Sequence, residues 1–258
     1  MAASNHLLLV LAVILACVVR PRSTYLFGLT AVGQDERTLL LTAHPDDETF
    51  FFSPTLTALS HIKKVGGIQD VLVVCLSTGN AKGLGNIRKE EFGQALEVFG
   101  IREGRRFILD HPNLQDNKTA AWDPAVIAQE LRSLVFQYSI TTIFTFDGHG
   151  ITGHPNHSSA LAGAAKLVST FPVSSANRRP RLFALDSRPA TKHLGPLAAL
   201  LPRRQRSSQG PVFVASLTDY ITALRAMVKH PSQLRLVAFL KGLCSRYLWV
   251  NEWAEVTV

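Results

Sequence analysis

The chain has 258 residues, of which 47% are hydrophobic, and it contains no internal repeat or low-complexity tract. This length is enough for one α/β domain with a full hydrophobic core. Its formal net charge of +8 indicates an acidic partner, unless the basic loops are merely solvated. Because the sequence has no zinc-finger, RNP or helix-turn-helix pattern, we expect no nucleic acid among its partners.

The N-terminal segment predicts a membrane anchor. Leu7–Val19 is an unbroken apolar run of thirteen residues, and Arg20 and Arg22 follow it. At about 1.5 Å per residue it spans about 20 Å, so it crosses the roughly 30 Å hydrocarbon core only if the preceding polar residues are included. A cleavable signal peptide is the alternative, but no Lys or Arg precedes the run. Because the positive charges follow it, we expect an uncleaved anchor over residues 1–22 and a cytosolic remainder.

Strand-like and helix-like segments alternate along the rest of the chain. Short apolar and β-branched runs predict strands over Thr38–His44, Val71–Ser77, Arg106–Asp110, Ile140–Asp147, Arg181–Asp186 and Val212–Leu217. Helical patterns lie between them, over Pro54–Lys64, Ile87–Phe99, Pro124–Tyr138, Pro155–Val168 and Thr218–Lys229. Near-continuous apolar strands such as Val71–Leu76 are typical of strands buried on both faces. The alternation predicts a Rossmann-like, three-layer α/β fold with a mostly parallel sheet.

We expect a linker over residues 23–37 and a single domain over residues 38–258. Much of the positive charge lies in Arg178–Arg181 and Arg203–Arg206. Next to a membrane anchor, these loops favour attraction to a leaflet that carries anionic lipid. The final helix-like segment, Leu234–Trp249, mixes apolar and basic residues, and it either docks on the core or lies in the membrane interface.

The turn after the first strand carries a candidate metal site. His44-Pro45-Asp46-Asp47-Glu48 follows an apolar run, and Pro45 forces the chain to turn. His44 and Asp47 can then face one centre while Asp46 points elsewhere. Imidazole nitrogen and carboxylate oxygen are both good zinc ligands. The plain alternative is a polar turn in which Asp46 or Asp47 caps the next helix.

A second turn of the same design follows the strand Ile140–Phe146. Its glycines allow close approach of the backbone, and His154 and His157 lie one helical turn apart, facing the same way. Ligands of open parallel sheets bind at the carboxyl ends of the strands, where both turns lie. One His and one Asp from the first turn and a His from the second would make a two-His, one-carboxylate site with an open position. Such a site suits catalytic zinc, with non-haem iron as the main competitor.

These residues resemble the PIG-L/LmbE-like family of zinc-dependent de-N-acetylases, whose hallmarks are an AHPDDE turn and a later HxxH. Here they are Ala43–Glu48 and His154-Pro155-Asn156-His157. The resemblance continues through Ser77–Asn80 and Arg88–Glu91, and more weakly through Val212–Val214, His230 and Ser232-Gln233-Leu234. With the apolar N-terminus, it is greatest to the eukaryotic members that act on N-acetylglucosaminyl-phosphatidylinositol.

The resemblance implies a role for each residue. His44, Asp47 and His157 match the family's metal ligands, which hold Zn²⁺ or another divalent metal such as Fe²⁺ and leave a position for water. Zinc lowers the pKa of such a water towards 7. Asp46 matches the general base. Together with the metal, His154, as a charged or donating imidazole, would stabilise the oxyanion.

Other positions are less direct. Arg88 resembles a substrate-contacting arginine, with an intrahelical pair to Glu91 as the alternative. The alternative for Asp46 is a helix cap, and for His154 a structural histidine. Two positions depart from some bacterial members: Asn156 stands where they have Asp, and Thr152 where they have Tyr.

The implied activity is hydrolysis of the acetamide of N-acetylglucosaminyl-phosphatidylinositol, a step of glycosylphosphatidylinositol (GPI) anchor assembly at the cytosolic face of the endoplasmic reticulum membrane. The alternatives are de-N-acetylation of a soluble amino-sugar conjugate and a non-catalytic membrane scaffold. Cys17, Cys75 and Cys244 cannot form a disulfide framework, which favours a cytosolic domain. Asn117 and Asn156 begin glycosylation sequons, and a glycan on Asn156 would obstruct the site if the domain were lumenal.

Overall fold

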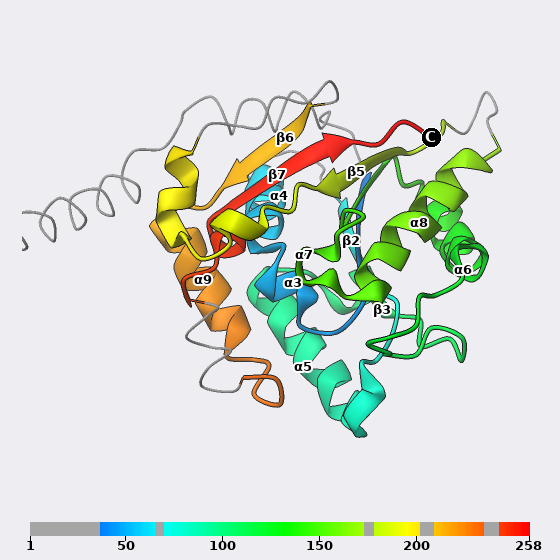
Figure 1. Ribbon diagram of the computed structural model, residues 1–258, viewed down its shortest axis with the longest axis horizontal. Coiled ribbons are helices and arrows are strands. Elements are labelled where there is room, and N and C mark those ends of the chain that lie inside the picture. Colours follow the sequence, from blue (N-terminus) through cyan, green and yellow to red (C-terminus); the bar gives the residue numbers. More distant parts are fainter. Residues whose placement is uncertain (1–36, 65–69, 173–177, 202–208, 235–242) are drawn as a thin grey trace, which may run out of the picture.

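The computed structural model describes residues 37–64, 70–172, 178–201, 209–234 and 243–258 (Figure 1). The predicted anchor, residues 1–22, and nearly all of the predicted linker lie outside this part of the chain. Among the described residues, no helix combines the length and the apolar character needed to cross a membrane.

The described strands form one sheet in the order β3-β2-β1-β4-β5-β7-β6. They are β1 Arg37–Thr42, β2 Asp70–Cys75, β3 Arg106–Ile108, β4 Thr142–Thr145, β5 Arg181–Leu185, β6 Gln209–Val214 and β7 Val250–Glu255. All pairs from β3 to β5 are parallel, whereas β7 runs antiparallel to both β5 and β6. The predicted α/β fold with a mostly parallel sheet is therefore confirmed, and β7 is a strand that the sequence patterns missed.

Helices cover both faces of the sheet (Figure 1). They are α3 Asp47–Phe50, α4 Ser53–Lys64, α5 Gly85–Val98, α6 Pro124–Gln137, α7 Gly150–Gly153, α8 Pro155–Ser169 and α9 Leu217–Met227. The chain moves outward from β1 to β3 through α4 and α5, then returns to β4 and β5 through α6 and α8. Right-handed crossovers in opposite directions place these two pairs on opposite faces. Accordingly, α6 packs against α8, and α9 packs against α4 and α5.

Local chemistry fixes where the helices begin. The Asp123 carboxylate accepts a hydrogen bond from the Ala125 N–H at 2.8 Å, and Pro124 occupies the first position of α6. Ser216 and Asp219 form a reciprocal capping box at the start of α9. These pairs satisfy backbone donors that a helix cannot satisfy internally, so the helix starts are specified by the sequence itself.

The strand order reverses between β1 and β4, which are neighbours in the sheet although about a hundred positions apart in the chain. Leu39, Leu40 and Leu41 of β1 are fully buried between the two helical layers. The turns after β1 and β4 therefore lie side by side at the carboxyl edge of the sheet. This switch point is where open α/β sheets bind ligands.

The C-terminal segment differs from its prediction. Residues 235–242 of the expected helix lie outside the described part, and its end forms a 3₁₀ turn, Arg246–Leu248, that leads into β7. Tyr247 and Trp249 are only 3% and 4% exposed. These aromatic side chains pack into the protein core, so the described end of the segment docks on the core, as the first alternative predicted, although residues 246–248 form a 3₁₀ turn and not an α-helix.

Candidate active site

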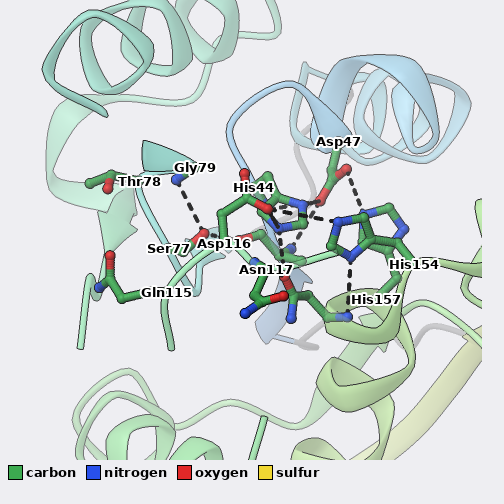
Figure 2. A network of polar contacts seen from close by, with 12 residues as sticks. His44, Asp47, Ser77, Thr78, Gly79, Gln115, Asp116, Asn117, His154 and His157 are labelled. Atoms are coloured by element: carbon green, nitrogen blue, oxygen red, sulfur yellow. Dashed lines mark hydrogen bonds and ion pairs between the residues drawn. The ribbon is translucent and has the colours of Figure 1, made fainter. Parts of the chain in front are cut away.

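The three residues that match metal ligands converge at the switch point. Single ligand atoms of His44, Asp47 and His157 lie within 4.8 Å of one another, and all three side chains are buried. Figure 2 shows the imidazoles of His44 and His157 turned toward the Asp47 carboxylate. A nitrogen–nitrogen–oxygen donor set of this spacing fits a divalent transition metal.

The two carboxylate oxygens of Asp47 contact different groups. Oδ2 accepts hydrogen bonds from the backbone N–H groups of Ala43 at 3.0 Å and His44 at 2.8 Å. Oδ1 lies 3.3 Å from His157 Nε2 and is the oxygen that faces the site. Although burial acts in the opposite direction, the His157 and His44 imidazoles hold the pKa of Asp47 below its usual range. The carboxylate is therefore fixed in place and ionised, as a metal ligand must be.

His157 is oriented by the glycine loop. Its Nδ1 lies 2.9 Å from the Gly150 carbonyl, to which it donates, so Nε2 is left with a free lone pair toward Asp47. Gly150 has φ +59°, and a Cβ at this position would lie 2.8 Å from His157 Cβ. The Asp147 carboxylate in turn accepts from the Gly150 N–H and from the Ser187 hydroxyl. The close approach predicted for these glycines is thus an approach to His157.

The tautomer of His44 follows from the Asn156 side chain. The Asn156 Oδ1 accepts the Asn117 N–H at 3.1 Å, and its Nδ2 donates to the Ala120 carbonyl at 3.0 Å, so the amide has only one satisfactory orientation. Oδ1 also lies 3.1 Å from His44 Nε2, which must be the protonated nitrogen. His44 Nδ1 is then free and faces Asp47 Oδ2 at 3.8 Å. Both imidazoles therefore present a lone pair to the same centre.

Asp46 stands beside this centre in a strained conformation. Its φ of +118° is unusual for a non-glycine residue, and its N–H donates to Glu48 Oε2 at 2.9 Å. It precedes α3, but its side chain forms no capping hydrogen bond, so the helix-cap alternative is not realised. Burial and the charge of Asp47 raise the pKa of Asp46 to about 7, although Arg88 lies only 3.5 Å from Oδ1. A cation bound next to it would lower this pKa.

His154 caps α8 and also faces the site. Its Nδ1 accepts the Asn156 N–H at 3.2 Å, so Nε2 carries the hydrogen, 3.7 Å from Asp116 Oδ1. Burial and the neighbouring His44 and His157 rings lower the pKa of His154 to about 4. The structure therefore favours a neutral, donating imidazole over a charged one, and the structural and functional alternatives for His154 are compatible.

Asp116 is a site residue that the sequence patterns missed. It lies in the loop between β3 and α6, 3.3 Å from His44 Nε2 (Figure 2). Its other oxygen lies 3.8 Å from the Arg88 guanidinium. With His44 and His154 it forms a second cluster of possible metal donors. The available clue was its place after a parallel strand, at the same edge of the sheet as the two motifs.

Arg88 clamps the backbone of the site. Its guanidinium donates to the Pro45 carbonyl at 2.6 Å and to the Gly79 carbonyl at 2.9 Å. The alternative was an ion pair between Arg88 and Glu91, and no such pair forms between these two described residues. The Glu91 carboxylate instead accepts hydrogen bonds from the N–H and the hydroxyl of Ser232. Arg88 is 7% exposed, so it contacts a ligand only within the cavity described next.

All six predicted site residues line one cavity of about 290 Å³. They are His44, Asp46, Asp47, Arg88, His154 and His157. A wider depression of about 810 Å³ along α5 shares none of them. His149, between two glycines, is exposed and lines neither. The smaller cavity is therefore the candidate active site, because it alone of the two combines metal donors with a base and hydrogen-bond donors.

Sequence comparison identifies relatives that match from half to most of the chain. A family model described as PIG-L: GlcNAc-PI de-N-acetylase matches residues 39–168. The N-acetylglucosaminyl-phosphatidylinositol de-N-acetylase of Bos taurus is 33% identical over 229 residues, which cover 85% of this chain and 83% of that protein. A probable enzyme of the same name from Schizosaccharomyces pombe is 40% identical over 152 residues, which cover 59% of this chain but only 57% of that protein.

Solved structures share the fold. The N,N'-diacetylchitobiose deacetylase from Pyrococcus horikoshii superimposes with a TM-score of 0.63 at 16% identity, over 91% of this chain and 89% of that one. The zinc-inhibited form of the teicoplanin deacetylase Orf2 gives a TM-score of 0.58 at 14% identity, over 86% of this chain and 98% of that one. The fold, the converging motifs and the match over half of the sequence agree, and the chain belongs to the PIG-L family of GlcNAc-PI de-N-acetylases.

Proposed function

We propose that this protein hydrolyses the acetamide of N-acetylglucosaminyl-phosphatidylinositol to acetate and glucosaminyl-phosphatidylinositol, a step of GPI-anchor assembly. The observation that carries the proposal is the convergence of three buried side chains, His44, Asp47 and His157, beside Asp46 in one cavity. The enzyme of Bos taurus and the probable enzyme of Dictyostelium discoideum, which cover 85% and 86% of this chain, both carry the N-acetylglucosaminyl-phosphatidylinositol de-N-acetylase name, which supports the substrate.

We assign the metal to His44 Nδ1, Asp47 Oδ1 and His157 Nε2, the three atoms that the hydrogen bonds leave free. Zn²⁺ is the ion that best suits two imidazoles and one carboxylate, with Fe²⁺ as the competitor. When bound, such an ion would lower the pKa of a water molecule and polarise the acetamide carbonyl.

The protein groups supply the proton transfers. Asp46 takes a proton from the attacking water, because its carboxylate borders the site but is not needed as a ligand. The water oxygen bonds to the acetyl carbon, and negative charge develops on the carbonyl oxygen. The His154 Nε2–H donates to this oxygen, which a neutral imidazole can do. The proton held by Asp46 then passes to the leaving glucosamine nitrogen as the C–N bond breaks.

The cellular location is part of the proposal. Residues 1–22 would anchor the protein in the endoplasmic reticulum membrane, with the catalytic domain in the cytosol, because Arg20 and Arg22 follow the apolar run. The structure changes how this is tested. Asn156 is fully buried, so it cannot carry a glycan in the folded domain on either side of the membrane, whereas Asn117 is exposed. Only the Asn117 sequon reports topology.

In sealed microsomes, added protease should digest the catalytic domain, and Asn117 should carry no glycan. A protected domain with a glycan on Asn117 would reverse the orientation. Deleting residues 1–19 should slow turnover of membrane-embedded lipid while leaving a soluble substrate unaffected, because the anchor raises local concentration only.

Activity itself is tested by acetate release. Purified protein should release acetate from N-acetylglucosaminyl-phosphatidylinositol, lose the activity on chelation and regain it with added zinc. Asp46→Asn is the matched control, since it retains the ligand set but removes the base. Release from a soluble N-acetylglucosamine conjugate alone, with none from the lipid, would reject the proposed substrate.

A further inference from the structure

A second cavity adjoins the candidate active site. It has a volume of about 410 Å³ and shares Asp46, Phe51 and Gln233 with the cavity that holds the metal donors. Ligand pockets of proteins usually measure about 300 to 1,000 Å³. The metal cavity, at about 290 Å³, is thus of a size for a single sugar ring. The remainder of a larger substrate must lie elsewhere, and the adjoining cavity, which shares three lining residues with the metal cavity, is the nearest candidate of the two other cavities described.

The lining of this second cavity is apolar with a cationic side. Phe50, Phe51, Ile151 and Tyr247 provide the apolar walls. Lys192 and His193 also line it, while Asp46, at the border with the metal cavity, is the only carboxylate among the lining residues. Negative charge on a ligand is therefore favoured at the Lys192 side and disfavoured near Asp46.

The walls are built by tertiary contacts. Ile151 has φ +59° and ψ −52°, a conformation that a β-branched residue adopts only when its surroundings impose it. Its N–H donates to the Ser187 hydroxyl at 3.1 Å, and this hydroxyl donates to Asp147 at 2.7 Å. These bonds place the Ile151 side chain against the cavity.

The cationic side is tied down as well. The Lys192 carbonyl accepts the Arg246 N–H at 2.9 Å, and the Tyr247 hydroxyl accepts the Arg188 N–H at 3.0 Å. The loop that carries Lys192 is thereby joined to the turn before β7. With its oxygen already accepting this bond, the Tyr247 hydroxyl has its own hydrogen left to donate.

We propose that the second cavity binds the inositol phosphate of the substrate, with the ring against the Phe51 and Tyr247 side and the phosphodiester beside Lys192 and His193. This inference rests on the proposed function, because it places the amino sugar in the metal cavity. A lysine ammonium and an imidazole N–H are suitable donors to phosphate oxygens. The acyl chains would continue beyond the phosphate, outside the cavity.

The test compares three substrates: N-acetylglucosaminyl-inositol, which lacks phosphate, its soluble inositol phosphate counterpart, and N-acetylglucosaminyl-phosphatidylinositol in mixed micelles. Lys192→Gln removes the charge while keeping much of the side chain. Lys166→Gln, on an exposed position of α8 away from both cavities, is the matched control. Thermal unfolding of both variants verifies that each is folded.

For Lys192→Gln, we expect KM to rise about tenfold for both phosphate-bearing substrates, with kcat little changed and the phosphate-free substrate unaffected. The Lys166→Gln control should match the wild type on all three. An equal loss on the phosphate-free substrate, no change on any substrate, or a loss confined to the micellar lipid would each overturn the assignment. The last result would mean that Lys192 contacts the lipid surface. Failure of the wild-type protein to cleave any of the three would instead reject the proposed function itself.

Discussion

Replacing Gly150 by Ala should separate the positioning of His157 from the folding of the domain. Gly150 has φ +59°, and its carbonyl accepts the Nδ1–H of His157. An added Cβ would lie 2.8 Å from His157 Cβ and 3.3 Å from the Ser158 nitrogen, whereas ordinary contacts begin at 3.4 Å. His157 would have to move by about 0.6 Å, the difference between 2.8 and 3.4 Å, away from the carbonyl that orients it.

The chain offers a matched control. Gly153 has φ +77°, but a Cβ there would meet nothing within 4 Å. Gly150→Ala and Gly153→Ala thus share the cost of a left-handed alanine, about 1 to 2 kcal/mol, which for a domain of this size lowers Tm by roughly 2 to 8 °C. Only Gly150→Ala also disturbs His157. Because loss of a partner that orients a metal ligand typically costs about 10- to 100-fold in affinity, we expect a loss of this size for Gly150→Ala alone.

The assay is a competition titration of zinc against a chelator, run beside thermal unfolding of the metal-free proteins. Similar Tm values with unequal zinc affinity would support the reasoning. Equal zinc affinity in the two variants, with the wild-type value retained, would refute it and would show that the Gly150 carbonyl does not position a ligand.

Two further predictions concern the carboxylates and a buried histidine. Asp46→Asn should keep the metal but lower kcat by about two or more orders of magnitude, while Asp47→Asn should lose the metal. If metal content and kcat, measured side by side, fall together in both variants, the assignment of Asp46 as base and Asp47 as ligand is wrong. His230 and Glu48 form a fully buried contact at 2.6 Å, so His230→Gln should cost about 3 to 5 kcal/mol in urea unfolding of the metal-free protein. Despite opposing burial, Glu48 raises the pKa of His230 above 6.5, so this contribution should be full below pH 6.5 and decline as pH rises through the folded-state pKa. A difference that does not vary between pH 5.5 and 8.5 would exclude a charged pair.

Local sequence patterns were enough to predict the site residues that lie in two short turns. Leu39–Leu41 could be recognised as a buried strand because each of its side chains is apolar, and the turn after it carries three of the six predicted residues within four positions. His154 caps α8 and His157 lies in its first turn, where Pro155 marks the helix start. Since parallel strands end at the same edge of a sheet, the meeting of the two turns followed from the strand prediction.

β7 was missed because its polar residues are satisfied by distant partners. Asn251 is fully buried, and its side-chain oxygen accepts from the Thr55 N–H and hydroxyl. Glu252, also buried, pairs with Arg188. A strand buried on both faces normally appears as an apolar run, so two polar residues in its centre conceal it. Only the tertiary structure reveals that their hydrogen-bonding groups have partners.

Long-range partners of the motif residues were hidden for the same reason. Glu48 belongs to the first motif, but its contact, His230, lies 182 positions away. This contact is consequential, because the other oxygen of Glu48 holds the N–H of Asp46 in its strained conformation. Asp116 likewise comes from a loop that has no periodicity to interpret. Sequence patterns could identify the residues of the reaction, but not the residues that hold them.

The Asn156 position shows how such a partner changes the meaning of a motif. Some bacterial members have Asp at this place, where the present chain has Asn156. In the structure, however, the Asn156 side chain acts on His44, and its Nδ2 donates to the Ala120 carbonyl, which a carboxylate cannot do. His154 receives only the backbone N–H of Asn156, and the carboxylate near its Nε2 is that of Asp116. The amide therefore fixes the tautomer of a metal ligand, while the loop after β3 supplies the negative charge near His154.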